Sequence, residues 1–299
     1  MSRQPFYLCG PTASGKTSLA LGLAKALDGE VVNADAFQVY RGVEVLSAAP
    51  SRAEMSECPH HLFGFLGLEE PMDAAKYASL AENIIADILQ RGKLPIVVGG
   101  SGLYLKFLTH GIADAPGADP AIRAELDALP VDEILARLKK LDPEEAARQN
   151  QQNRRHLSRA LEICLVTGGK ASDRRQNFQD PALVKDLRGI ALSWPRDELA
   201  ERIALRSRMM LNKGAIEEVR QLPKSAQTVR QAIGVREIEA FLAGELSREE
   251  CEERLTISTR QYAKRQRNWF RRESWLVPID GHLSVGDQIG ECRRVLCGE

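Results

Sequence analysis

The chain has 299 residues, of which 43% are hydrophobic and 27% are charged, and its 41 basic residues balance its 41 acidic residues. This composition is typical of a globular protein with room for one large or two modest domains, and it excludes long disordered regions. No apolar run reaches the roughly 18 residues of a membrane span, and the balanced charge argues against a small basic nucleic-acid-binding module.

The first third of the chain alternates between short apolar strands and helices. We expect strands at 6–9, 30–34 and 94–98, and helices at 16–27 and 74–91. Such alternation predicts a parallel sheet, in which functional groups lie at the carboxyl ends of the strands. The predicted fold class is therefore α/β, a P-loop-type parallel sheet with flanking helices plus a helical insertion domain.

The turn after the first predicted strand carries the sequence GPTASGKT, which matches the P-loop pattern G-x-x-x-x-G-K-[ST] in full. Its glycines let backbone N–H groups converge on phosphate oxygens, and the following helix directs its positive dipole end to the same point. Lys16 adds a positive charge, and the hydroxyl of Thr17 is placed to bind Mg²⁺. The predicted diphosphate-binding residues of this loop are Gly10, Pro11, Thr12, Ala13, Ser14, Gly15, Lys16 and Thr17.

The P-loop by itself does not name the reaction, because most P-loops bind a nucleoside triphosphate. We find no strand of four apolar residues that ends in the magnesium-binding aspartate of an ATPase. The strand at 94–98 ends instead in Gly99, Gly100 and Ser101. The sequence therefore disfavours an ATPase.

Asp35 follows the second predicted strand, in the segment NADAFQVYRG. On a parallel sheet this position places a carboxylate beside the P-loop. One interpretation is a helix N-cap or an ordinary loop aspartate. The other is a general base, or a carboxylate that orients a nucleophile.

The pattern changes after Gly111. Helical patterns at 118–129, 131–141 and 152–167 follow one another without a strand, and we interpret 112–187 as a helical insertion. A strand at 189–194 and helices at 197–222 and 235–273 return the chain to the core. The catalytic core is thus expected to comprise 1–111 and 188–299.

Basic residues gather in two places of this neutral chain. Such blocks favour local contact with a polyanion, although solvated helix faces look similar. The first block contains Arg148, Arg154, Arg155, Arg159, Lys170, Arg174 and Arg175, and the second contains Arg254, Arg260, Lys264, Arg265, Arg267, Arg271 and Arg272.

Several segments together resemble a known family. GPTASGKT, DAFQVYRG, VVGGSGLYLK, RALE, and QAIGVREI with RQYAKRQRNWFR occur in the order that is typical of the tRNA dimethylallyltransferases, or tRNA isopentenyltransferases. The resemblance extends to about Trp275, and other P-loop families do not share the later segments. It implies transfer of a dimethylallyl group from dimethylallyl diphosphate to the exocyclic amine of the adenosine 3′ of the anticodon in tRNA, with Mg²⁺ as cofactor.

The resemblance also implies roles for single residues. Asp35 matches the family's catalytic aspartate, and Ser101 stands where the family usually has a threonine near the reacting centre and the RNA. The segment Asp35, Ala36, Phe37 and Gln38 matches the part that contacts the target base and its neighbours.

Two arginines of the helix at 197–222 match a pair that helps hold the diphosphate in the family. They are Arg202 and Arg206, which share one helix face because they are four residues apart. The alternative interpretation is that they form ion pairs within the helix, with Glu198 and Glu201.

Further tRNA contacts are implied by the insertion, which resembles the family's anticodon-loop-binding domain. Arg123 and Arg159 match RNA-contacting positions there. In the basic helix at 260–273 the aromatic residues are expected to anchor the core, whereas Arg260, Lys264 and Arg267 face RNA phosphates. The target base must leave its stack to reach a pocket beside the P-loop.

Four positions depart from the family pattern. Ala49 replaces a common lysine, Gly64 an acidic residue, Asn153 an aspartate and His156 an arginine. The missing lysine charge is expected to affect tRNA affinity and to leave diphosphate binding unchanged.

Three alternatives fit the P-loop. A small-molecule kinase would use ATP but leaves the two basic blocks unexplained. An isopentenyltransferase for free adenine nucleotides would need no helical insertion. An RNA-binding module with a vestigial P-loop would lose no activity on substitution of Asp35.

The cellular location is predicted from the cysteines and the start of the chain. The six cysteines lack CxxC spacing, and the four-residue apolar stretch near the N-terminus is too short for a signal peptide. We therefore expect a cytoplasmic protein with reduced thiols and no membrane contact. We also expect a monomer.

Overall fold

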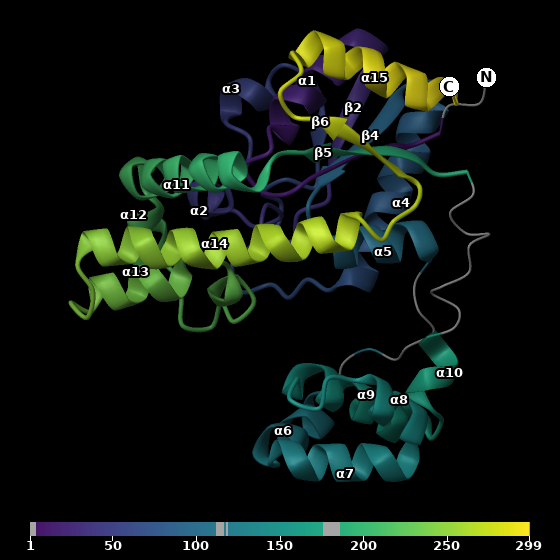
Figure 1. Ribbon diagram of the computed structural model, residues 1–299, viewed down its shortest axis with the longest axis vertical. Coiled ribbons are helices and arrows are strands. Elements are labelled where there is room, and N and C mark those ends of the chain that lie inside the picture. Colours follow the sequence, from purple (N-terminus) through teal and green to yellow (C-terminus); the bar gives the residue numbers. More distant parts are fainter. Residues whose placement is uncertain (1–3, 112–116, 118, 176–185, 299) are drawn as a thin grey trace. The chain divides into compact units, whose positions relative to one another are not determined.

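The computed structural model describes residues 4–111, 117, 119–175 and 186–298. The chain divides into two compact units, one formed by Met1–Leu108 with Lys185–Glu299 and the other by Thr109–Val184 (Figure 1). The second unit corresponds to the insertion expected at 112–187, although residue 112 itself lies outside the described residues. No helix in the described ranges is long and apolar enough to cross a bilayer.

A six-stranded parallel sheet forms the centre of the first unit, in the order β3-β2-β4-β1-β5-β6. The α/β class is thereby confirmed, and β1, β2, β4 and β5 lie within about one residue of the predicted strands. Two strands were not predicted, because β3 has only two residues and β6 contains Pro278. The strands are β1 Phe6–Cys9, β2 Gly29–Asn33, β3 His60–His61, β4 Leu94–Gly99, β5 Arg188–Ser193 and β6 Leu276–Asp280.

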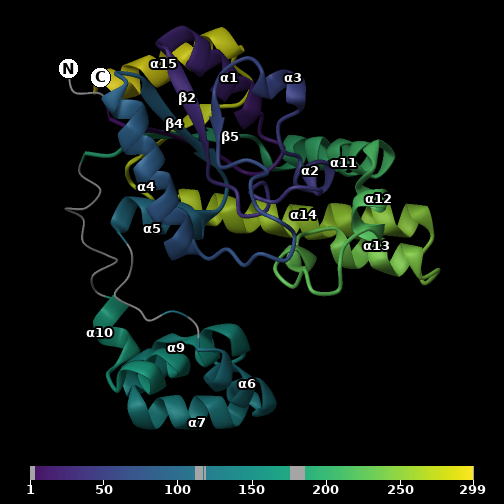
Figure 2. The ribbon, with the colours of Figure 1, turned by 180° about the vertical axis from the view of Figure 1, so that it is seen from behind.

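Helices cover both faces of this sheet (Figures 1 and 2). Helices α1 and α15 pack against each other, and they contact β2, β4, β5 and β6. Phe6 and Leu8 of β1 point into this layer, whereas Tyr7 points to the other face and packs edge-on against Trp275 at 5.2 Å. The helices of this unit are α1 Lys16–Leu27, α2 Glu44–Ser47, α3 Arg52–Met55, α4 Ala74–Gln90, α5 Gly102–His110, α11 Arg196–Lys213, α12 Ala215–Arg220, η3 Val229–Gln231, α13 Val235–Leu242, α14 Arg248–Phe270 and α15 Val285–Cys297.

The two long helices expected at 197–222 and 235–273 are each divided, so those predictions were wrong. Gly214, with φ 120°, separates α11 from α12, and Gly244, with φ 76°, lies between α13 and α14. A positive φ ends a right-handed helix and is favoured by glycine. Ser247 then starts α14 with a capping box to Glu250.

The second unit is helical, and α6, α7 and α9 match the expected helices; residue 118, where the first was expected to start, lies outside the described residues. Its core is built from the apolar faces of these helices, with Ile134, Leu138, Leu157 and Leu161 fully buried. The helices are α6 Pro120–Ala128, α7 Val131–Leu141, α8 Pro143–Arg148, α9 Arg154–Thr167 and α10 Ala171–Arg175.

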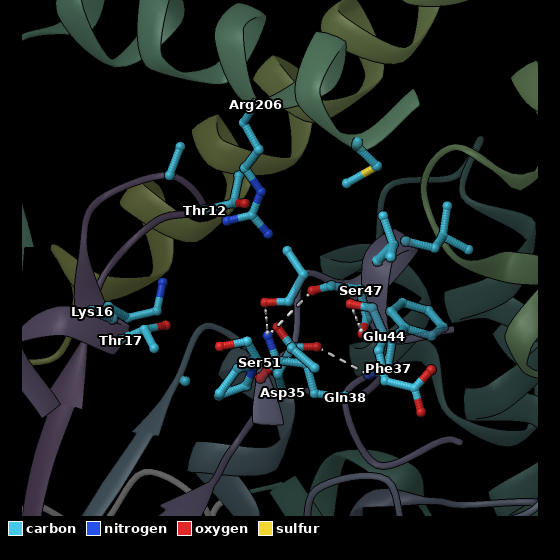
Figure 3. Close-up of a pocket in the computed structure, with 18 of the residues that line it drawn as sticks. Thr12, Lys16, Thr17, Asp35, Phe37, Gln38, Glu44, Ser47, Ser51 and Arg206 are labelled. Atoms are coloured by element: carbon cyan, nitrogen blue, oxygen red, sulfur yellow. Dashed lines mark hydrogen bonds between the residues drawn. The ribbon is translucent and has the colours of Figure 1, made fainter. Parts of the chain in front are cut away.

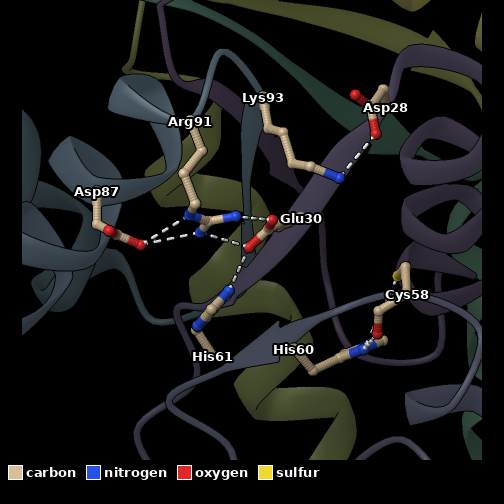
Figure 4. A network of polar contacts seen from close by, with 8 residues as sticks. All are labelled: Asp28, Glu30, Cys58, His60, His61, Asp87, Arg91 and Lys93. Carbon is tan, nitrogen blue, oxygen red and sulfur yellow. Dashed lines mark hydrogen bonds and ion pairs between the residues drawn. The ribbon is translucent and has the colours of Figure 1, made fainter.

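A buried carboxylate at the start of β2 is enclosed by a polar network (Figure 4). Glu30, whose side chain is 2% exposed, accepts hydrogen bonds from both Nη atoms of Arg91 and from His61 Nε2 at 2.7 Å. Asp87 forms a second ion pair with Arg91 at 2.9 Å. The bonds from Arg91 and then from His61 lower the pKa of Glu30 to about 2, although burial acts in the opposite direction.

Candidate active site

The P-loop connects β1 to α1 in a tight turn (Figure 3). A Cβ added to Gly10 would lie 2.8 Å from Ser14 Oγ, and Gly15 adopts φ 97°. Ala13 has φ 63°, in the left-handed region that is strained for a residue with a Cβ. Ser14 Oγ is buried and has no hydrogen-bond partner among the described residues. An incoming anion would satisfy this hydroxyl.

Two cations converge beside the loop. Lys16 Nζ donates to the carbonyl oxygens of Gly10 at 2.9 Å and of Pro11 at 2.8 Å. Burial and the positive charge of Arg206 lower the pKa of Lys16 to about 8, whereas the negative charge of Asp35 acts in the opposite direction.

Arg206 enters the pocket from α11 (Figure 3). Burial lowers the pKa of its guanidinium, and the nearby Asp35 carboxylate opposes that shift. Within the part of the chain that the structure describes, Arg206 forms no hydrogen bond or ion pair. The negative charge of Asp35 thus acts on both Lys16 and Arg206, and neither cation forms an ion pair with another described residue.

Asp35 follows β2 directly, and its backbone is held by the buried side chain of Asn33. Asn33 Oδ1 accepts a hydrogen bond from Asp35 N at 2.8 Å, and Asn33 Nδ2 donates to Asp35 O at 3.1 Å and to Leu62 O at 2.9 Å. One Asp35 oxygen accepts from Phe37 N at 3.0 Å. No helix begins here, so the N-cap interpretation is wrong. The sequence did not point to Asn33.

Gln266 of α14 joins the P-loop to the loop after β4, a role that the sequence did not indicate. Its side chain is buried, its Oε1 accepts from Thr12 N at 2.8 Å, and its Nε2 donates to Gly100 O at 3.0 Å. A Cβ on Gly100 would lie 2.1 Å from that Nε2, so the close approach requires glycine. The one feature of the sequence that could have pointed to Gln266 is its place in the segment RQYAKRQRNWFR.

Arg202 supports the P-loop from the outside. Its Nε donates to Ala13 O at 2.8 Å, and its guanidinium lies 4.1 Å from the centre of the Trp194 ring. Trp194 Nε1 in turn donates to Ser14 O at 3.0 Å. Glu198, the alternative partner of Arg202, binds His282 at 2.6 Å.

A pocket of about 980 Å³ connects these groups. Its walls come from the P-loop, the segment after β2, α2, α3, α11 and α14 (Figure 3). It brings together most of the predicted diphosphate-binding and catalytic residues, namely Thr12, Ala13, Ser14, Gly15, Lys16, Thr17, Asp35, Arg202 and Arg206. Two residues predicted to contact tRNA, Phe37 and Gln38, also line it.

Other predicted residues do not line this pocket. Gly10 and Pro11 belong to the loop but not to its lining, and neither Ala36 nor Ser101 reaches it. Ser101 lies just before α5, where its N–H donates to Ala34 O at 3.2 Å. On α14 the lining residues are Leu255, Thr259, Tyr262 and Gln266. The adjacent positions carry the exposed Arg260 and Lys264 and the half-buried Arg267.

The two arginines predicted to bind tRNA in the helical unit share one buried carboxylate. Arg123 Nε lies 3.0 Å and Arg159 Nη1 lies 2.6 Å from Glu162, whose side chain is 2% exposed. Asp119 N also donates to Glu162 at 2.9 Å. Arg123 therefore ties α6 to α9, whereas Arg159 pairs with Glu162 within α9. Their side chains are 53% and 35% exposed.

A bound metal would have few ligands from the protein. The described residues contain no group of three or more His, Cys, Asp or Glu side chains that could hold one. Thr17 presents a hydroxyl in the pocket next to Lys16. This donor set fits Mg²⁺, which prefers oxygen ligands and commonly binds through substrate phosphates and water.

The chain is similar to a family of known proteins. The family model described as IPP transferase matches residues 38–273, and the model described as isopentenyl transferase matches residues 4–69. A tRNA dimethylallyltransferase of Akkermansia muciniphila is 43% identical over 292 residues, which cover 95% of this chain and 98% of the relative. A tRNA dimethylallyltransferase of Anaeromyxobacter dehalogenans is 43% identical over 288 residues, which cover 91% of this chain and 94% of the relative.

Solved structures show the same similarity. The full-length tRNA isopentenylpyrophosphate transferase of Bacillus halodurans superposes with a TM-score of 0.70 at 32% identity, covering 100% of this chain and 96% of that one. A eukaryotic dimethylallyltransferase acting on tRNA gives a TM-score of 0.81 at 29% identity, covering 98% of this chain and 78% of that one.

Proposed function

The chain belongs to the tRNA dimethylallyltransferase family, and we propose that it transfers a dimethylallyl group from dimethylallyl diphosphate to the exocyclic amine of the adenosine 3′ of the anticodon in tRNA. One observation carries the proposal. Lys16 and Arg206 lie in the pocket beside the P-loop and form no ion pair with another described residue, and the Asp35 carboxylate lies in the same pocket. The site is thus prepared for a diphosphate and for an amine.

Diphosphate is the leaving group of this reaction. Its negative charge grows as the bond between the dimethylallyl carbon and the diphosphate oxygen breaks, and groups already in place lower that barrier. Lys16, Arg206 and the free N–H groups of the P-loop are those groups. Thr12 N donates to Gln266 and Ser14 N donates to Pro11 O, so the other amides of the loop remain for the phosphate oxygens.

The adenosine amine is a weak nucleophile because its lone pair is delocalised into the ring. Asp35 would accept one N–H of the amine and take that proton as the new carbon–nitrogen bond forms. Only one of the two carboxylate oxygens is used within the described residues, by Phe37 N. The other oxygen is therefore available for the amine.

Mg²⁺ would be held by the Thr17 hydroxyl and by the diphosphate, and its chemistry is to neutralise charge on the leaving group. The tRNA would lie along exposed cations of α14 and of the helical unit, among them Arg260, Lys264, Arg123 and Arg159. We also propose that the protein acts as a monomer.

The test is mass spectrometry of nucleosides from tRNA incubated with the protein, dimethylallyl diphosphate and Mg²⁺. Wild-type protein should produce isopentenyladenosine, and Asp35→Asn should lower kcat by roughly a thousandfold while tRNA binding persists. Asp87→Asn, an exposed aspartate outside the pocket, is the control. Absence of product with every tRNA tested, or release of ADP from ATP in its place, would reject the proposal.

A further inference from the structure

Helix α2 is a four-residue helix in the pocket wall, and Glu218 of α12 holds its first turn. Its N-cap, Val43, offers no side-chain hydrogen bond. Instead Glu218 Oε1 accepts from Val45 N at 2.8 Å and Glu218 Oε2 accepts from Leu46 N at 2.7 Å. A helix of one turn is not stable alone, so its position depends on such contacts.

The other end of α2 holds Gln38 (Figure 3). Gln38 Nε2 donates to Ser47 O at 3.2 Å and to Ala48 O at 3.0 Å. These carbonyls lie at the end of the helix, where backbone acceptors lack partners within the helix. Two facing carbonyls fix the orientation of the amide, because the reversed amide would place oxygen against oxygen.

The orientation leaves one amide atom of Gln38 for a ligand. Its Oε1 accepts no hydrogen bond from the described residues, and Gln38, α2 and Glu218 all line the pocket. A glutamine that binds adenine through both amide atoms needs its nitrogen free. Because Nε2 of Gln38 already donates to two carbonyl oxygens, Gln38 can bind a base only as an acceptor, through Oε1.

We propose that Glu218 is a positioning residue, which fixes Gln38 through α2 so that Gln38 Oε1 accepts a hydrogen bond from an N–H of the target base. This inference rests on the proposed function. The exocyclic amine of adenosine is a hydrogen-bond donor, whereas a base that presents only a carbonyl at this point would oppose Oε1. Glu218 thus acts on base selection without touching the RNA.

Steady-state kinetics with an anticodon stem-loop RNA test the role of Glu218. Glu218→Ala and the isosteric Glu218→Gln should raise the KM for the RNA by about tenfold and leave the KM for dimethylallyl diphosphate within about twofold. The matched control is Glu217→Ala on the same helix, because Glu217 is 52% exposed and pairs with Arg220 rather than with α2. Equal RNA KM values in the Glu218 and Glu217 variants would overturn the inference.

A double-mutant cycle separates positioning from a general structural effect. If Glu218 acts through Gln38, then Glu218→Gln should add little to the RNA KM in a Gln38→Met background. Fully additive effects would show that Glu218 acts on something else. Thermal unfolding of each variant reports whether the fold is retained.

Failure of the inference and failure of the proposed function give different results. Loss of the function appears as wild-type protein that makes no isopentenyladenosine. Fluorescence anisotropy with the labelled stem-loop measures RNA affinity without transfer, so it tests Glu218 in either case. Unchanged affinity in both Glu218 variants contradicts the inference.

Discussion

Ionisable groups lie near both ends of strand β2, and only those at its start form ion pairs within the described residues. At its start, the buried Glu30 receives hydrogen bonds from Arg91 and His61, and its pKa is lowered to about 2. Beyond its end lies Asp35, whose negative charge acts on both Lys16 and Arg206. Burial lowers the pKa of both cations.

The difference shows which charges support the fold and which serve a ligand. A buried charge with complete partners stabilises the state in which those partners are assembled. A buried cation without a sufficient partner costs folding free energy, which a bound anion recovers. The start of β2 is therefore a structural network, and the far end is a site prepared for diphosphate.

Replacing Arg206 by methionine should lower the activity of the protein and raise its stability. We expect kcat/KM for dimethylallyl diphosphate to fall by about a hundredfold or more, because a donor to the leaving group is lost. The free energy of unfolding of the ligand-free protein should rise by about 1 kcal/mol, because an unpaired buried charge is removed. Kinetics and urea unfolding measure both, with Arg208→Met as control since Arg208 pairs with Glu252 outside the pocket. Lower stability of Arg206→Met would contradict the comparison.

Replacing Glu30 by glutamine should lower the stability of the protein and leave its activity unchanged. The shift of the Glu30 pKa from 4.5 to about 2 corresponds to about 3 kcal/mol of stability at neutral pH. Because the folded pKa is lowered, this contribution is present above pH 4.5 and is lost as the pH falls toward 2. Urea unfolding at pH 7 should show the full loss and at pH 3 a smaller one, with kcat unchanged.

The control for that substitution is Asp28→Asn. Asp28 forms an exposed ion pair with Lys93, and such pairs contribute about 1 kcal/mol or less. Equal destabilisation by the two substitutions would show that burial and pairing of Glu30 have no special effect.

The pH dependence of pyrophosphate binding should reveal Lys16. With its pKa at about 8 in the free protein, the ammonium is lost above that pH, and affinity should then fall by about tenfold per pH unit. The folded protein binds fewer protons than the unfolded chain between pH 8 and 10.5, so its stability should rise across this interval. Calorimetry from pH 7 to 10 measures the affinity, and Lys16→Met controls for titration of pyrophosphate itself. A Lys16→Met variant with the same pH profile would exclude Lys16 as the titrating group.

The sequence by itself determined the features that depend on neighbouring residues. The P-loop pattern, the strands on either side of it and the place of Asp35 after β2 are written in contiguous residues, so their positions were predicted. The same local logic failed at Gly214 and Gly244, because a single glycine is compatible with a helix until its φ is known.

Only the tertiary structure decided which distant side chains complete the site. Gln266 lies 254 positions from Thr12, and Glu218 lies 173 positions from Val45, yet each forms a hydrogen bond that shapes the pocket. Arg123 of α6 gained a buried partner in Glu162 of α9, 39 positions away, that no spacing suggested. Such contacts follow from how α11, α12 and α14 pack around the pocket, and from how α6 packs on α9 in the helical unit. Packing depends on the three-dimensional fit of whole surfaces, whereas periodicity records only which face of a helix is apolar.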